Sequence, residues 1–108
     1  MGDVHQRSVK RTDGFDRWLG ELRDDIAKAA INDRIDRVKG GNLGDVEPVK
    51  GMAGLYEIRV DVGPGYRVYF IMVGSTIVLL LIGGDKSTQT ADITAAKNLL
   101  SDIQNAAC

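Results

Sequence analysis

The spacing of apolar residues changes partway along the chain. Between Phe15 and Val38, apolar residues recur three or four positions apart, as on one face of a helix. From Leu55 onward they alternate with polar residues, which is typical of strands. The first helical stripe comprises Phe15, Trp18, Leu19 and Leu22, and the second comprises Ile26, Ala30, Ile31, Ile35 and Val38. The pattern predicts a helical hairpin followed by a sheet.

Capping residues set the expected limits of these elements. Thr12 or Asp13 can cap the first helix, the Asp24-Asp25 pair can cap the second, and glycines 40–41 stop it. Residues 4–11 form a weakly alternating segment, expected as an edge strand because basic side chains protect an open edge. The glycine-rich residues 40–54 are expected to form a loop. A C-terminal helix, capped by Thr88 or Thr90, is predicted from Ile93, Ala96, Leu99, Leu100 and Ile103.

The first β-hairpin is expected to turn at Gly63-Pro64-Gly65. A three-residue loop places Val62 opposite Tyr66 and gives one face that is entirely apolar. The opposite face then carries the pairs Asp61–Arg67, Arg59–Tyr69 and Glu57–Ile71.

The second hairpin is expected to turn at Gly74-Ser75, so that Val73 opposes Thr76. This register places Arg67 near Ile82, and the last strand, residues 76–82, ends at the Gly83-Gly84 pair. An apolar group then shares the face of the arginines and needs a cover, either the C-terminal helix or a partner protein. The group comprises Ile71, Val78, Leu80 and Ile82.

Length and composition favour one small domain, residues 1–108, with a modest core. The net charge of −1 gives no general attraction to nucleic acid. The apolar run 76–82 is too short to cross a membrane and no export signal is visible, so a cytoplasmic location is expected. His5 is the only histidine and Cys108 the only cysteine, which argues against a zinc site and against a histidine acid–base pair. No cofactor or metal is expected.

Two strings carry a family likeness: YRVYF at residues 66–70 and GGDKSTQ at residues 83–89. With the Phe15…Trp18 opening, the chain resembles RelE/ParE-superfamily toxins of type II toxin–antitoxin modules, closest to the HigB-like (addiction module killer) branch. The resemblance implies an α+β fold in the order β-α-α-β-β-β-α. Its small, mainly antiparallel sheet would be covered on one face by the N-terminal helical hairpin, with a C-terminal helix to follow.

The resemblance also implies an activity and partners. HigB- and RelE-like toxins are ribosome-dependent mRNA endonucleases, which would give this chain the ribosome and mRNA as partners. ParE-like members instead inhibit DNA gyrase without nuclease chemistry, and a third possibility is a domain that serves mainly in antitoxin binding and operon control. A cognate helix-turn-helix antitoxin would neutralise the toxin, and operator DNA would be bound only through their complex. The hypothesis is that part of the antitoxin contacts the arginine face or its rim and blocks Arg67. Glu57 replaces a lysine of RelE-like sequences and Asp92 lies where RelE has a tyrosine, which favours the gyrase alternative.

Arg59, Arg67 and Lys86 are the candidate catalytic residues, on positions where the resemblance places basic side chains. Attack of a 2′-OH on the adjacent phosphate builds negative charge, and two guanidinium groups on neighbouring strands could bind that phosphate together. The alternative is a surface ion pair between Asp61 and Arg67. Lys86 could donate to the leaving oxygen, hold the backbone or be a solvated loop residue.

Three further residues are candidates for RNA binding. Tyr69 could stack on a base or pack against its neighbours. Glu57 could act as a general base, although a role as charge partner of Arg59 is the stronger expectation. Lys50, in the predicted loop, could contact a phosphate.

Overall fold

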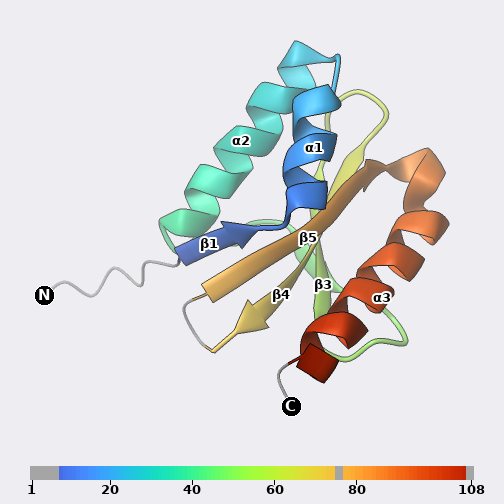
Figure 1. Ribbon diagram of the computed structural model, residues 1–108. Helices are drawn as coiled ribbons and strands as arrows, with labels where there is room; N and C mark the ends of the chain where they lie inside the picture. The colour runs from blue at the N-terminus through green and yellow to red at the C-terminus, as the bar shows by residue number, and fades with distance from the viewer. Residues whose placement is uncertain (1–7, 75–76, 107–108) are drawn as a thin grey trace, which may run out of the picture.

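The computed structural model describes residues 8–74 and 77–106 and contains one sheet with helices on both faces (Figure 1). Helices α1 and α2 lie on one side and α3 lies on the other. No helix in the described part is long and apolar enough to cross a bilayer. The elements in chain order are β1 (Ser8–Arg11), α1 (Asp13–Glu21), α2 (Asp25–Lys39), β2 (Val46–Pro48), β3 (Leu55–Val60), β4 (Tyr66–Val73), β5 (Ile77–Asp85), the 3₁₀ turn η1 (Lys86–Thr88) and α3 (Gln89–Ala106).

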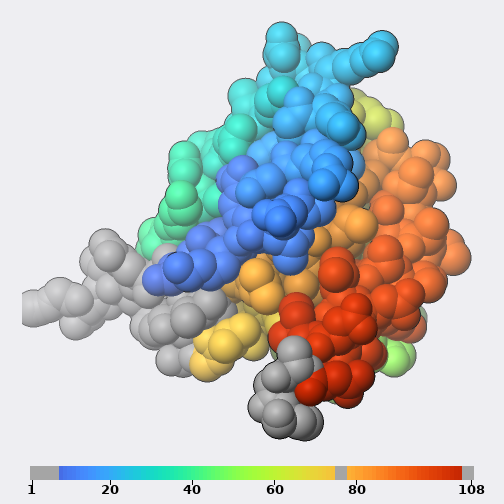
Figure 2. All heavy atoms as spheres, in the orientation of Figure 1, coloured from blue at the N-terminus to red at the C-terminus, as the bar shows by residue number. Residues whose placement is uncertain are grey.

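The sheet confirms the predicted α+β class and its mainly antiparallel character. Its strand order is β1-β5-β4-β3-β2, and among these described strands only the β1–β5 pair is parallel. Of the predicted strand at residues 4–11, residues 8–11 form β1, at the edge as expected, while residues 4–7 lie outside the described residues. A strip of β5 stays visible between α1 and α3 in the space-filling view (Figure 2).

Strand β2 corrects the prediction of a loop over residues 40–54. Val46 to Pro48 pair antiparallel with β3, and Glu47 lies opposite Glu57. This strand was missed because three residues among glycines give no readable alternation. Proline is tolerated there because an edge strand has one side free of ladder hydrogen bonds.

The β3–β4 hairpin differs from the predicted register by two residues. Val60, rather than Val62, lies opposite Tyr66, because the loop spans residues 61–65. The amide of Gly65 donates to the carbonyl of Val62 at 3.0 Å, and Gly63 and Gly65 have positive φ angles of 56° and 85°. Side chains alternate with a period of two, so a shift of two residues changes the partners but leaves each face as predicted.

The β4–β5 hairpin contains a larger correction. Val73 lies opposite Ile77, one residue beyond the prediction, and a second register shift falls between Tyr69 and Phe70. The first shift moves Val78 and Leu80 to the face covered by α1 and α2. The predicted apolar group on the arginine face is therefore wrong in part. Its remaining members, Ile71 and Ile82, pack with Leu81 in the cluster beneath α3.

The helices begin close to the predicted caps. The Thr12 hydroxyl accepts from the Phe15 amide at 3.0 Å and donates to the carbonyl of Leu81 at 2.7 Å, which joins α1 to the irregular part of β5. Asp24 caps α2. Ile26, predicted to lie on the buried stripe, is 74% exposed, and the adjacent Ala27 is buried instead. The buried residues of α2 are Ala27, Ile31, Ile35 and Val38, spaced three or four positions apart, and Ile26 lies about 100° around the helix from Ala27, outside that stripe.

The prediction that the Gly83-Gly84 pair ends the last strand is wrong, because β5 continues to Asp85. Consecutive strand residues face opposite sides. A Cβ on Gly83 would lie 2.3 Å from the Trp18 ring, and one on Gly84 would lie 1.7 Å from Oδ2 of Asp92. The two glycines thus let α1 and α3 approach the same strand from both sides. Helix α3 continues directly from η1, so neither Thr88 nor Thr90 caps it as predicted.

Candidate functional site

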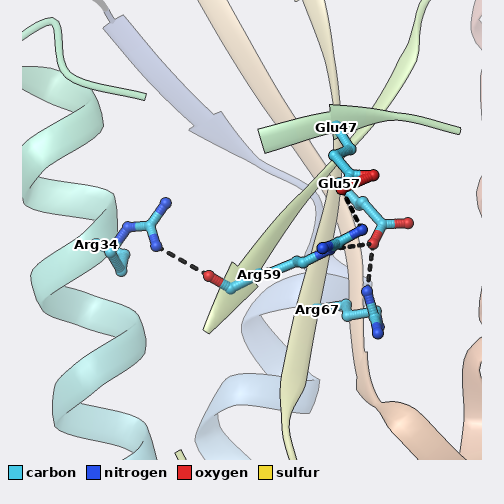
Figure 3. A network of polar contacts seen from close by, with 5 residues as sticks. All are labelled: Arg34, Glu47, Glu57, Arg59 and Arg67. Carbon is cyan, nitrogen blue, oxygen red and sulfur yellow. Dashed lines mark hydrogen bonds and ion pairs between the residues drawn. The ribbon is translucent and has the colours of Figure 1, made fainter. Parts of the chain in front are cut away.

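Arg59 on β3 and Arg67 on β4 lie directly opposite each other on the face that also packs against α3. The register shift described above converts their predicted diagonal relation into a direct pair. Figure 3 shows both side chains extending from neighbouring strands toward Glu57. Two guanidinium groups therefore project from one row of the sheet.

Glu57 is the centre of this cluster. It is only 6% exposed, and its Oε2 accepts from Nη1 of Arg67 at 2.5 Å and from Nε of Arg59 at 3.4 Å. The expected pairing of Glu57 with Arg59 is present. The alternative pairing of Asp61 with Arg67 is not, because the five-residue loop moves Asp61 out of the ladder. Charge-assisted hydrogen bonds of this kind fix the orientation of the guanidinium groups.

Glu47 on the edge strand β2 is a second carboxylate partner that sequence reasoning missed. It lies opposite Glu57 and forms an ion pair with Nη2 of Arg59. Two facing carboxylates repel each other, and Arg59 offsets that repulsion by binding both. Burial alone would lower the pKa of Arg59, but Glu47 and then Glu57 outweigh it and raise that pKa above its usual value. Recognising β2 as a strand would have revealed this pair.

Arg34 supports the cluster from the other side of the sheet. From α2, its Nη1 donates to the carbonyl of Arg59 and its Nη2 donates to the carbonyl of Leu43, each at 2.9 Å. Figure 3 shows this side chain extending from the helix to the backbone of β3. The helical hairpin thereby holds the strand that carries Arg59. Nothing in the spacing of α2 distinguishes Arg34 from the solvent-exposed charges of that helix.

Two hollows adjoin the arginine pair. The larger, about 300 Å³, lies between α3, the β2 segment and the sheet, and the smaller, about 50 Å³, lies on the side of the β3–β4 turn. Arg59 and Arg67 line both. The larger is also lined by Glu47, Pro48, Val49, Lys50, Glu57, Gln89 and Ile93, and the smaller by Asp61, Gly65, Tyr66 and Lys86.

Lys86 is held beside the arginines by the turn that follows β5. Its amide donates to the carbonyl of Gly65 at 3.0 Å, while its exposed side chain lines the smaller hollow. The Ser87 hydroxyl donates to Asp85 at 2.6 Å and lowers the pKa of Asp85. Amide donors of Ser87 and Thr88 add to this shift, against the opposing effect of burial. The structure thus places all three predicted catalytic residues together.

Of the three predicted RNA-binding residues, Tyr69 requires a correction. Its side chain is 0% exposed beneath α3, so its ring offers no face to a base. Its hydroxyl has no hydrogen-bond partner in the described part of the protein. Burial, with the nearby carboxylates of Glu57 and Asp92, raises the pKa of Tyr69 to about 12. Lys50 is exposed at the rim of the larger hollow, and Glu57 lines its base.

Glu47 and Glu57 are two possible metal ligands at this site. Across residues 8–74 and 77–106, no group of three or more histidine, cysteine, aspartate or glutamate side chains could hold a metal ion. His5 and Cys108 lie outside these ranges. The chemistry available at the site comes from guanidinium, ammonium and carboxylate groups.

Comparison with known sequences places this geometry in context. The sequence profile of the family described as phage-derived protein Gp49-like (DUF891) matches residues 17–101. An uncharacterized protein of Haemophilus influenzae is 47% identical over 95 residues, which cover 88% of this chain and 94% of that protein. The family match spans the positions of the arginine pair and Lys86.

Comparison with solved structures confirms the predicted RelE-like fold. A mutant of the Escherichia coli toxin RelE in the free state matches with a TM-score of 0.66 and 14% identity, over 86% of this chain and 97% of that one. The toxin–antitoxin complex RelBE2 of Mycobacterium tuberculosis matches with a TM-score of 0.60 and 21% identity, over 75% of this chain and 99% of that one. The RelB–RelE complex of Methanococcus jannaschii matches with a TM-score of 0.53 and 19% identity, over 77% of this chain and 96% of the matched chain.

Proposed function

Because the chain belongs to the Gp49-like family and has the fold of RelE, we propose that it is the toxin of a type II toxin–antitoxin module and cleaves mRNA on the translating ribosome. One observation carries this proposal: Arg59 and Arg67 lie side by side on one sheet face, between two hollows. A pair of guanidinium groups suits a phosphate whose negative charge grows during reaction.

The residues on either side of the arginines supply proton transfer. Cleavage by the 2′-OH forms a bond from that oxygen to phosphorus, breaks the bond to the 5′-oxygen and needs a base and an acid on opposite sides. Glu47 lines one hollow and Lys86 lines the other, with the arginines between them. Substrate phosphate displaces Glu47 from Arg59, Glu47 takes the proton of the 2′-OH, and Lys86 gives a proton to the leaving oxygen.

Glu57 has a different role in this scheme. Both of its arginine bonds orient guanidinium groups, and its carboxylate is buried beneath them. We assign it as a positioning residue rather than the general base. The acidic content of the whole chain is compatible with an RNA substrate, because the ribosome, rather than long-range attraction, would align the mRNA.

The partners follow from the same proposal. A cognate antitoxin of the helix-turn-helix class would cover the hollow beside Arg67, and operator DNA would be bound through the antitoxin. The M. tuberculosis and M. jannaschii relatives of this fold were solved in complex with their antitoxins, which supports a protein partner of this kind. The HigB-like branch remains our assignment from the YRVYF and GGDKSTQ strings.

Inhibition of DNA gyrase is the second candidate. The observation that favours it is Glu57, which offsets one positive charge of the arginine pair where the nuclease scheme would benefit from another cation. In this alternative the same surface binds gyrase, and this protein itself cleaves no bond.

Induction of the protein in cells, followed by mapping of mRNA 5′ ends, separates the two candidates. If the protein is a nuclease, its induction should produce in-frame breaks in mRNA, and these breaks should be lost in Arg67→Ala and in Lys86→Ala. Lys86 is exposed, so its variant should fold normally. The control is Arg37→Ala, which removes an exposed arginine of α2 that pairs with Asp33. Intact mRNA together with gyrase-linked DNA breaks would overturn the nuclease and support the alternative.

A further inference from the structure

The larger hollow has a composition that the phosphate chemistry does not explain. Beside the charged groups, three apolar side chains line it, Pro48 and Val49 on the β2 side and Ile93 on α3. Arg59 and Arg67 border the same space. Its volume of about 300 Å³ is at the lower end of the range for ligand pockets, which suits one nucleotide-sized group. Enzymes that bind an unstacked base hold it between aromatic or apolar side chains beside a phosphate contact.

Among the described residues that line this hollow, Gln89 is the one neutral polar side chain. It lies at the start of α3, directly after the turn that positions Lys86. In the part of the chain that the structure describes, its side-chain amide has no hydrogen-bond partner. A carboxamide offers a donor beside an acceptor, which is the pattern that glutamine uses to bind adenine.

We propose that the larger hollow is a base-binding subsite in which Pro48, Val49 and Ile93 enclose one RNA base and Gln89 reads its hydrogen-bonding edge. The inference rests on the proposed nuclease function, since it places the phosphate of the same nucleotide on Arg59 and Arg67. It also replaces Tyr69, which is buried, as the source of base contact. Gln89 is then the residue that sets the base preference of cleavage.

A change of one atom tests this reading. Gln89→Glu keeps the size of the side chain but leaves only acceptors, which suit the adjacent N1–H and N2–H donors of guanine and oppose an acceptor nitrogen of adenine. The added charge weakens binding of every anion, so the informative quantity is the ratio of two affinities. We expect the affinity for adenosine 3′-monophosphate relative to guanosine 3′-monophosphate to fall about tenfold or more.

The experiment is a titration of the full-length protein with these two nucleotides. The matched control is Asn98→Asp, which adds the same charge at an exposed position of α3 outside the hollow and should leave the ratio unchanged. An unchanged ratio in Gln89→Glu, or no binding of either nucleotide to the wild type, would overturn the proposal.

Mapping of mRNA cleavage in cells distinguishes a failure of the base-binding proposal from a failure of the proposed nuclease function. In-frame breaks whose base distribution is the same in wild type and Gln89→Glu would overturn the base-reading role and leave the nuclease standing. Absence of breaks in the wild type would remove the nuclease, whatever the nucleotide affinities are.

Discussion

Replacement of Glu57 by alanine should destabilise the protein by leaving Arg67 without its partner. The two side chains are 8% and 16% exposed and are joined at 2.5 Å. Truncating one member of a buried charge pair costs about 2–5 kcal/mol. Arg67 borders a hollow that water can enter, so the lower end applies, and we expect a loss of about 2 kcal/mol in the free energy of unfolding.

Inorganic phosphate should restore part of this loss. Removal of the carboxylate leaves two guanidinium groups facing an open space, so Glu57→Ala should bind phosphate more tightly than the wild type does. At a phosphate concentration 100 times its Kd, binding to the folded state alone adds about 2.7 kcal/mol. Urea denaturation with and without phosphate measures both effects.

Asp33→Ala is the control for this experiment. It breaks the exposed Asp33–Arg37 pair on α2, which should change stability by no more than about 0.5 kcal/mol. Phosphate stabilises many proteins by exclusion from their surfaces, and the control measures that background. Equal phosphate stabilisation of Glu57→Ala, Asp33→Ala and the wild type would refute the account of the arginine pair as an anion site.

Three further predictions concern the fold and the site. Gly83→Ala forces the Trp18 ring to move and should cost about 1–3 kcal/mol in urea denaturation. In a Trp18→Ala background the same change should be nearly neutral, and full additivity would contradict the contact. Because the pKa of Tyr69 is raised, its neutral form stabilises the fold at neutral pH, and that contribution is lost as pH rises from about 10 to about 12. Tyr69→Phe should reduce this alkaline loss, and an identical alkaline profile would argue against burial of the hydroxyl. Glu47→Gln should bind phosphate about two- to fivefold more tightly, since Arg59 no longer has a competing charge, yet cleave mRNA more slowly. Cleavage by Glu47→Gln at the wild-type rate would contradict the role of Glu47 as general base.

The sequence predicted the fold class and the faces of β3 and β4 because those depend on periodicity. Arg59 and Arg67 were expected on one face, and they remain there although the hairpin register differs by two residues. The length of the β3–β4 turn, in contrast, could not be derived from periodicity. A loop of five residues around Gly63 and Gly65 satisfies the same glycine pattern as the three-residue loop that was expected.

Errors in β5 and β2 have a different origin. An entirely apolar strand reads the same in any register, so Val78 and Leu80 could not be assigned to a face from their sequence. At the irregularity, the carbonyl of Leu81 accepts a hydrogen bond from the hydroxyl of Thr12, which is 69 residues distant in the sequence. Glu47 was missed because its strand is too short to show alternation. Long-range contacts, rather than local propensity, decided each of these positions.

Single-turnover cleavage of mRNA bound to translating ribosomes tests the central claim most directly. The wild type should produce fragments with 5′-hydroxyl ends, and Arg67→Ala should slow that step about 100-fold or more, as for the loss of one group that stabilises transition-state charge. Arg37→Ala should cleave at the wild-type rate. Fragments with 5′-phosphate ends, or equal rates for Arg67→Ala and the wild type, would contradict cleavage by a 2′-OH on a phosphate held by the arginine pair.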